Sequence, residues 1–151
     1  PGAYPGIESE ERGLSEAIAK NLSLLSNLKT PVIVIITGEG GSGGALAIGI
    51  GDHVCMLEHS IYAVASPEAC ASIVWRDGSK AKDAAEAMKV DAPNLRNLGL
   101  VDEVIEEPLG GAHRDIRGVS NSISQVIEKK LQTFDEVDIS DLLKKRYEKI
   151  K

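Results

Sequence analysis

The sequence predicts an α/β fold in which layers of helix and parallel strand pack on each other. Residues 32–36 form an apolar, β-branched run, Val-Ile-Val-Ile-Ile, which is typical of a strand buried on both faces of a parallel sheet. Helical periodicity precedes this run, and shorter apolar runs alternate with helical stretches after it. This alternation indicates a layered α/β domain.

One amphipathic helix is predicted between the turn-rich residues 1–6 and the apolar strand. Ser9, followed by Glu10 and Glu11, provides an N-terminal signal, and Thr30-Pro31 ends the helix. The apolar residues of its buried face recur every three or four positions, at Leu14, Ile18, Leu22, Leu25 and Leu28.

Beyond the strand, the glycine-rich residues 37–45 predict a turn, and a short helix follows that ends near Gly49 or Gly51. Ser66-Pro67-Glu68 opens a helix that runs to about Trp75, because serine is a good N-cap and proline fits the first helical position. Further strands are expected over residues 53–57, 61–65 and 101–105, and further helices over residues 80–88, 94–98, 116–131 and from 140 on. We divide the chain into a domain at residues 1–133 and a charged helical tail at residues 134–151.

Composition limits the classes of function. A length of 151 residues fits one domain with its own core, and a net charge of −6 with scattered basic residues argues against wholesale nucleic-acid binding. The longest apolar runs fall far short of a membrane span. Pro1, in place of methionine, suggests that this is not a native N-terminus.

The sequence predicts no metal site. Cys55 and Cys70 lie outside any Cys-x-x-Cys pattern or zinc spacing, and we expect two buried, reduced thiols. The histidines, which do not form a metal spacing either, are His53, His59 and His113.

Residues 37–45, Thr-Gly-Glu-Gly-Gly-Ser-Gly-Gly-Ala, are the strongest candidate for a functional site. Glycine lets the backbone take positive φ and lets a ligand approach the main chain. A helix start offers free N–H groups at the positive end of the helix dipole. The stretch therefore predicts a binding site for developing negative charge.

Two motif templates fit this stretch, and the stretch alone does not choose between them. Residues 38–43, Gly-x-Gly-x-x-Gly, match the dinucleotide fingerprint, with Glu58 placed for a ribose hydroxyl. Residues 40–44, Gly-x-Ser-x-Gly, match the nucleophile elbow of serine hydrolases, with Asp102 and then His113 in the order of a catalytic triad.

A third pattern concerns cofactor attachment. Residues 86–89, Glu-Ala-Met-Lys, resemble the biotin-attachment tetrapeptide of carrier domains, in which the lysine sits on a hairpin tip. Here the preceding residues are alanine-rich and helical, so we expect Lys89 to be an ordinary exposed lysine.

Several strings occur together in the order and spacing of one known family. They are Pro-Gly-Ala-Tyr-Pro-Gly at 1–6, Glu-Glu-Arg-Gly at 10–13, Glu-Ala-Ile-Ala at 16–19, Gly-Glu-Gly-Gly-Ser-Gly-Gly-Ala-Leu at 38–46, Ser-Pro-Glu at 66–68 and Glu-Pro-Leu-Gly-Gly-Ala-His at 107–113. On these strings the chain resembles the carboxyltransferase α subunits of multi-subunit acetyl-CoA carboxylase. The resemblance covers nearly all of residues 1–115 and, more loosely, the tail.

The resemblance implies a crotonase-like fold of the ClpP/crotonase type. This fold is a β-β-α spiral with a small second sheet and outer helices, here incomplete at the N-terminus because family members are longer. The resemblance also implies transfer of CO₂ from carboxybiotin, held on a separate carrier protein, to acetyl-CoA. The product is malonyl-CoA, in the first committed step of fatty acid synthesis, and no cofactor is bound covalently to this chain.

The resemblance further implies a hetero-oligomer. The expected partners are a carboxyltransferase β subunit, in an α2β2 assembly, the biotin carboxyl carrier protein and biotin carboxylase. The expected location is the bacterial cytoplasm or the plastid stroma.

The resemblance assigns the chemistry to backbone groups. Gly43 and Gly44 match the family's oxyanion pair, whose N–H groups would stabilise charge on the ureido oxygen of biotin. Gly40 and Gly41 are expected to bind substrate. Glycine is expected in the oxyanion pair because any Cβ would stand between backbone and ligand. Glu39 is expected to have a structural role rather than to act as a base.

Two other classes of function stay open at this point. One is a serine hydrolase with Ser42 as nucleophile, and the other is a non-catalytic crotonase-fold scaffold. Tyr4 and Arg12 match family positions without revealing a chemical role, and His113 is expected to be structural. Residues 144–146, Lys-Lys-Arg, are expected to form a solvated helix face.

Overall fold

Within residues 2–151, which the computed structural model describes, five strands form two parallel sheets. The larger sheet has the order β1 (Ile33–Ile36), β3 (His53–Leu57) and β5 (Glu103–Ile105). The smaller sheet pairs β2 (Glu39–Gly41) with β4 (Ile61–Ala63). The predicted α/β class is therefore confirmed, and the expectation for Pro1 lies outside the described residues.

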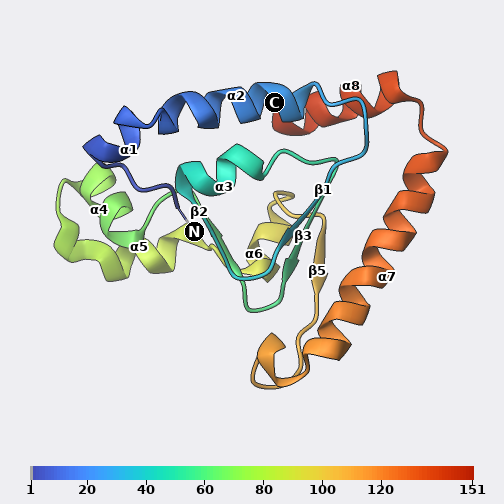
Figure 1. Ribbon diagram of the computed structural model, residues 1–151. Coiled ribbons are helices and arrows are strands. Elements are labelled where there is room, and N and C mark those ends of the chain that lie inside the picture. The colour runs from blue at the N-terminus through green and yellow to red at the C-terminus, as the bar shows by residue number, and fades with distance from the viewer. Residues whose placement is uncertain (1) are drawn as a thin grey trace.

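The chain visits the two sheets in turn, as a β-β-α spiral (Figure 1). β1 leads to β2 and then to helix α3 (Ser42–Ile48), and β3 leads to β4 and then to helix α4 (Pro67–Trp75). Because β3 pairs with β1 and β4 pairs with β2, each turn of the spiral adds one strand to each sheet. β5 then adds a third strand to the larger sheet, beside β3. This is the spiral, with its small second sheet, that the family resemblance implies.

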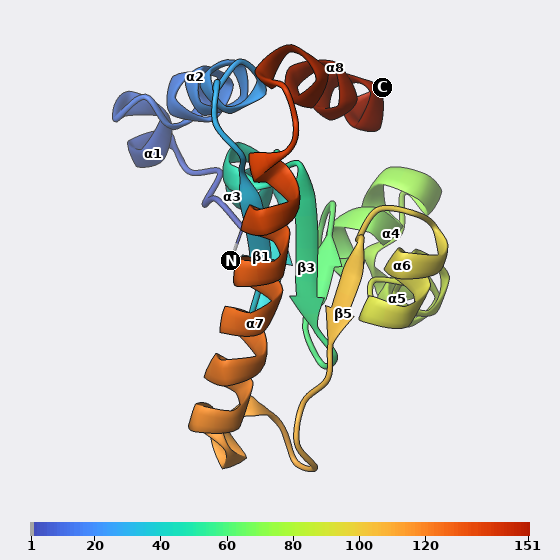
Figure 2. The ribbon, with the colours of Figure 1, turned by 90° about the vertical axis from the view of Figure 1, so that its right-hand side faces the viewer.

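Helices cover the two faces of the larger sheet, and β3 is its central strand. Met56 packs toward helix α6 (Ala92–Asn97) on one face. Cys55 packs toward helix α7 (Ile116–Asp135) on the other, and Figure 2 shows α7 running along the sheet. Successive side chains of a strand point to opposite faces, so a strand covered on both sides must be apolar throughout.

The expectation of burial on both faces is wrong for residues 32–36. β1 lies at the edge of the larger sheet, and Ile36 is its one buried residue, whereas all five residues of β3 are buried. The parallel pairing predicted from this run is confirmed.

The predicted first helix is in fact two helices, α1 (Ile7–Glu11) and α2 (Leu14–Ser26). They are separated at Gly13, whose φ of 79° lies in the left-handed region that glycine adopts at little cost. Ser9 therefore lies inside α1, and the prediction that it marks the start of the amphipathic helix is wrong.

Most of the later helices begin where their sequence signals place them. Ser66 caps α4, its Oγ accepting a hydrogen bond from the Ala69 N–H at 3.2 Å. Helix α6 begins earlier than predicted, because Asp91 caps it by accepting a hydrogen bond from the Asn94 N–H at 3.1 Å. The other elements of this region are α5 (Ala81–Met88) and the 3₁₀ turns η1 (Gly78–Lys80) and η2 (Ala112–Arg114).

Helix α7 continues to Asp135, beyond its predicted end at Leu131. The boundary drawn after residue 133 therefore falls inside a helix, and the division into a domain and a tail stays a prediction. None of the described helices combines the length and the apolar composition that crossing a bilayer requires.

The C-terminal helix α8 (Ile139–Ile150) lies beside α2 (Figures 1 and 2). The predicted solvated face at residues 144–146 is wrong for Arg146, which is 1% exposed. Its guanidinium makes a paired contact with Asp52, from Nε to Oδ1 at 2.9 Å and from Nη2 to Oδ2 at 2.7 Å. It also donates to the Leu25 carbonyl at 2.7 Å, at the end of α2.

Candidate functional site

The glycine-rich stretch is a strand and a helix start rather than a turn. Residues 39–41 form β2, and α3 begins directly at Ser42. Ser42 has a φ of 48°, in the left-handed region that side chains other than glycine rarely adopt. No side chain of the described residues caps α3, and the first N–H groups of a helix have no intrahelical acceptor. The structure therefore contains the uncapped helix start on which the predicted anion site depends.

Two cavities border α3. Gly43 and Ser42 line one of about 550 Å³, and Gly44 and Gly40 line another of about 370 Å³. Tyr62 lines both cavities. The two members of the predicted oxyanion pair therefore border different cavities.

Two of these glycines have a packing reason within the chain. A Cβ on Gly43 would lie 3.1 Å from Cδ1 of Ile18 in α2, and a Cβ on Gly40 would lie 2.9 Å from Cδ2 of Tyr62 in β4. The family resemblance explains the glycine at position 43 by the approach of a ligand, whereas the structure shows close approach of Ile18 in α2. Gly41 belongs to the β2–β4 ladder and borders neither of the two cavities.

The triad of the hydrolase hypothesis is not assembled. Asp102 lies just before β5, where its carboxylate accepts a hydrogen bond from the Val54 N–H at 2.7 Å and pairs with Lys149. His113 lies in η2, which follows the other end of β5 (Figure 2). Among the described residues, neither Ser42 nor Asp102 has a hydrogen bond to this histidine.

The acid of the dinucleotide hypothesis belongs to a loop network instead. Glu58 accepts a hydrogen bond from the Glu107 N–H at 3.2 Å. The Glu107 carboxylate in turn accepts bonds from the His59 N–H and the Ala112 N–H, each at 2.7 Å. Glu107 thus joins the β3–β4 turn to the loop before α7, which gives a structural reason for the glutamate in the string at residues 107–113. No local sequence pattern indicates this role, because His59 lies 48 positions from Glu107 in the chain.

Several other sequence candidates lie on the surface. Cys70 is half-buried, so the prediction of a buried thiol is wrong for this residue, and it is a free thiol like the buried Cys55. The candidates that are exposed are Tyr4, Arg12, Glu39, Ser42, Lys89 and His113.

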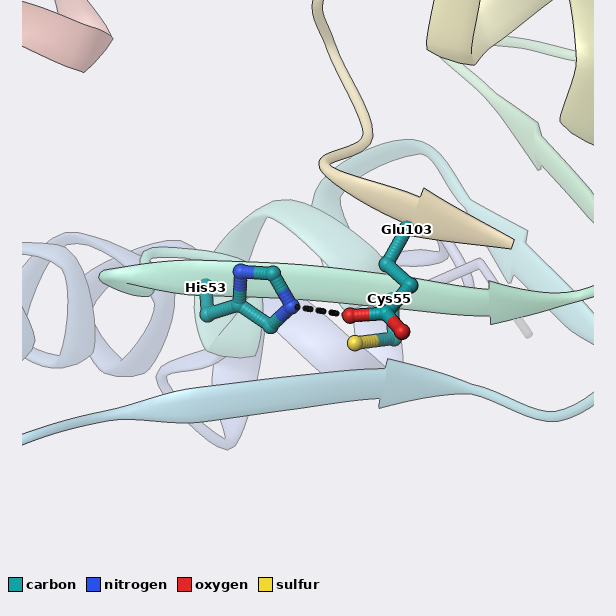
Figure 3. A group of neighbouring side chains, drawn as sticks. All are labelled: His53, Cys55 and Glu103. Carbon is teal, nitrogen blue, oxygen red and sulfur yellow. Dashed lines mark hydrogen bonds and ion pairs between the residues drawn. The ribbon is translucent and has the colours of Figure 1, made fainter. Parts of the chain in front are cut away.

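Three side chains with metal-binding chemistry come together on the α7 side of the larger sheet (Figure 3). His53 Nε2 lies 3.0 Å from Glu103 Oε2, and the ligand atoms of His53, Cys55 and Glu103 all lie within 4.8 Å of one another. Burial lowers the pKa of His53, against the opposing effect of the Glu103 hydrogen bond, and raises the pKa of Cys55 to about 11.

This group of three side chains is not predicted from the sequence. The signal that was available is the alternation of His53 and Cys55, since residues two apart on a strand face the same side. Glu103 joins them only because β5 pairs with β3, with Glu103 opposite Cys55.

Comparison with known proteins shows the family. All of residues 1–151 match the family model described as acetyl co-enzyme A carboxylase carboxyltransferase-like. The chain is 57% identical over 149 residues to the acetyl-coenzyme A carboxylase carboxyl transferase subunit alpha of Vibrio cholerae serotype O1. This alignment covers 99% of the chain and 47% of the relative, so the chain spans about half the length of the curated relatives it matches.

Solved structures of low sequence identity share the fold. A Pseudomonas malonate decarboxylase hetero-tetramer, solved with coenzyme A, matches with a TM-score of 0.65 at 19% identity, covering 95% of this chain and 56% of that one. An enoyl-CoA hydratase/isomerase from Marinobacter aquaeolei matches with a TM-score of 0.58 at 17% identity, covering 95% and 53%. The expected crotonase-like fold is thus confirmed. By its family match and its identity to a curated relative, the chain belongs to the acetyl-CoA carboxylase carboxyltransferase-like family.

Proposed function

We propose that this chain forms part of a carboxyltransferase that moves CO₂ from carboxybiotin, held on a separate carrier protein, to acetyl-CoA and yields malonyl-CoA for fatty acid synthesis. Its family and the name of its Vibrio cholerae relative support the proposal. The observation that carries it is the uncapped start of α3, where Gly43 and Gly44 border two cavities.

The proposed chemistry depends on the backbone of α3. Carboxybiotin would supply the CO₂, and its ureido oxygen would gain negative charge as the CO₂ leaves. The N–H groups of Gly43 and Gly44 would donate hydrogen bonds to that oxygen, at the positive end of the helix dipole. Preorganised donors of this kind contribute about 3–4 kcal/mol each to transition-state stabilisation. Gly40 would help to bind substrate as part of the wall that it shares with Gly44, and substrate binding by Gly41 stays a prediction, because Gly41 borders neither cavity.

The proposed assembly includes other chains. A β subunit would provide most of the acetyl-CoA side of the site in an α2β2 arrangement, with a biotin carboxyl carrier protein and a biotin carboxylase as further partners. Leu46 and Ile48 on α3 support an interface here, because these apolar side chains are 51% and 65% exposed. We place the complex in the bacterial cytoplasm or the plastid stroma, and the Vibrio cholerae relative is bacterial.

Gly44→Val tests the proposal. In a complex reconstituted with a β subunit and carboxylated carrier protein, we expect malonyl-CoA formation to fall by at least about 100-fold while the subunits still associate. Gly43 is unsuitable for this test, because its Cβ would lie 3.1 Å from Ile18 Cδ1 and could disturb packing. Glu39→Gln and Ser42→Ala are the matched controls, and both variants should keep their activity.

Two outcomes would overturn parts of the proposal. Turnover that survives Gly44→Val would remove the oxyanion assignment and leave the chain as a scaffold. The strained backbone at Ser42 is the one observation that favours a hydrolase, since nucleophile elbows are strained in this way. Covalent labelling of Ser42 by a fluorophosphonate would support that alternative, and we expect none.

A further inference from the structure

His53, Cys55 and Glu103 form a cluster that the proposed function does not use. His53 and Cys55 are two residues apart on β3 and point toward the same side of the larger sheet. Glu103 lies opposite Cys55 on β5 and extends over the same side (Figure 3). The layer above them is α7, so the cluster lies between sheet and helix.

The distances between the three ligand atoms are close to those of a metal site. Nε2 of His53 and Oε2 of Glu103 are 3.0 Å apart, and all three ligand atoms lie within 4.8 Å of one another. Neighbouring ligands of a tetrahedral zinc ion are separated by about 3.5 Å, given its bond lengths to sulfur and nitrogen. Side-chain shifts of about 1 Å would therefore close the site, without movement of the strands.

We propose that His53, Cys55 and Glu103 bind a divalent transition-metal ion with the ligand preferences of zinc. Imidazole nitrogen, thiolate sulfur and carboxylate oxygen are all zinc ligands, and the mixed set disfavours magnesium and calcium, which prefer oxygen. On binding, the Cys55 thiol releases its proton to solvent and the sulfur forms the bond to the metal. Water completes the fourth position from the side of Glu103, whose side chain is 32% exposed.

One neighbouring carboxylate favours this arrangement, whereas two nearby lysines oppose the approach of a cation. Nδ1 of His53 faces Oδ2 of Asp102 at 3.7 Å, and a carboxylate behind a ligating imidazole orients the ring and raises its basicity. Asp102 is itself held by the Val54 N–H and by Lys149 of α8. The charged groups that influence the cluster are the two acids of the β5 segment, Asp102 and Glu103, and the two lysines of α7 and α8, Lys130 and Lys149.

Bound metal would connect β3 to β5 through side chains, beside the backbone ladder that already joins them. Such a site contributes to folding, because an ion that binds only the native state stabilises it by mass action. We therefore expect the thermal midpoint of the chain to rise with added zinc and to return to its starting value after chelation.

Cobalt(II) is the probe for the test, because it takes tetrahedral zinc sites and absorbs visibly there. After treatment with a chelator, the full chain should bind a single cobalt ion and develop sulfur-to-cobalt charge-transfer absorption. Cys70→Ser, which removes the other thiol, should leave this absorption unchanged. Cys55→Ser should abolish the absorption.

Because Cys55 is fully buried, its variant could be destabilised, and a second variant keeps the test decisive. Glu103→Gln replaces a partly exposed carboxylate, and we expect cobalt affinity to fall at least about tenfold while circular dichroism stays native. Absence of the charge-transfer band in the folded chain, its persistence in Cys55→Ser, or equal affinity in Glu103→Gln would each overturn the proposal. The readout is metal binding rather than carboxyl transfer, so this test and that of the proposed function fail separately.

Discussion

Arg146 joins three segments that are far apart in the sequence. Its guanidinium pairs with Asp52 after α3 and donates to backbone carbonyls of Leu25, Leu28 and Thr30 at 2.7–2.8 Å. The Asp52 carboxylate, whose side chain is 4% exposed, also accepts a hydrogen bond from the Val32 N–H at 2.7 Å. Both charges of this buried pair are thus compensated. A buried ion pair needs such compensation to offset the cost of removing its charges from water.

Removing one partner should therefore be costly. We expect Arg146→Ala to lower the free energy of unfolding by about 3–5 kcal/mol, because it leaves the Asp52 carboxylate buried without its cation. Urea unfolding followed by circular dichroism measures the change. Lys145→Ala on the exposed side of the same helix is the control and should change stability by less than about 0.5 kcal/mol. Equal effects of the two substitutions would show that the guanidinium contacts contribute nothing.

At the scale of secondary-structure elements, single caps fix where helices begin. Asp91 accepts hydrogen bonds from the backbone and the side chain of Asn94, at 3.1 and 2.7 Å, and so starts α6. Ser66 performs the same task for α4 with a hydroxyl. The two caps differ in one physical respect, which is that only the carboxylate titrates.

This difference gives a prediction about pH. The hydrogen bonds from Asn94 lower the pKa of Asp91 below its ordinary value of 3.8, so the stabilisation is complete above that value and is lost as pH falls through the lowered pKa. We expect Asp91→Ala to cost about 1 kcal/mol at neutral pH and progressively less below pH 3.8. Urea unfolding across this range provides the measurement. The cost of Ser66→Ala should stay constant over the same range, and an unchanging cost for Asp91→Ala would contradict the assignment.

A second element-scale prediction concerns the two loops that Glu107 joins. Both oxygens of its carboxylate accept backbone N–H bonds, from His59 and from Ala112. Glu107→Gln places an amide NH₂ against one of these donors, and we expect a loss of about 1.5–3 kcal/mol, the range for hydrogen bonds to a charged group. Faster hydrogen exchange at the amides of His59 and Ala112 should accompany the loss. Glu106→Gln, at an exposed position, should leave both amides unchanged.

Across the whole molecule, local sequence signals predict the helices and strands, whereas contacts between distant residues bring the side chains of a site together. The Ser66 cap, the Pro67 helix start and the strand at residues 53–57 depend on neighbouring residues, and these predictions are confirmed. The glycines at residues 40 and 41 predict a turn, because glycine lets the backbone take positive φ. They form a strand because β4 supplies a parallel partner, which no local pattern indicates.

The clusters of polar side chains are also formed by contacts that no local sequence pattern indicates. Periodicity places His53 and Cys55 on one strand face, but Glu103 reaches them through a pairing across 50 positions. Arg146 contacts Asp52, which lies 94 positions away in the chain. The basic string at residues 144–146 predicts a solvated helix face, but this distant contact buries Arg146. The assignment of Gly43 and Gly44 as the oxyanion pair stays a prediction, because only a bound ligand would identify which oxygen their N–H groups contact.

These long-range contacts join the C-terminal helix to the rest of the described chain, and removing the helix tests whether it belongs to the same folded unit. A chain that ends at Val137 loses Arg146, the buried Leu142 and the ion pair between Lys149 and Asp102. We expect a larger loss of stability than for Arg146→Ala alone, because the truncation also uncovers apolar surface. Hydrogen exchange should rise at residues 25–32, where Arg146 contacts the carbonyls of Leu25, Leu28 and Thr30, and near Asp102, while α4 and α5 keep their protection. Unchanged exchange at residues 25–32 would instead mean that α8 is an independent tail, as the division of the chain at residue 133 predicts.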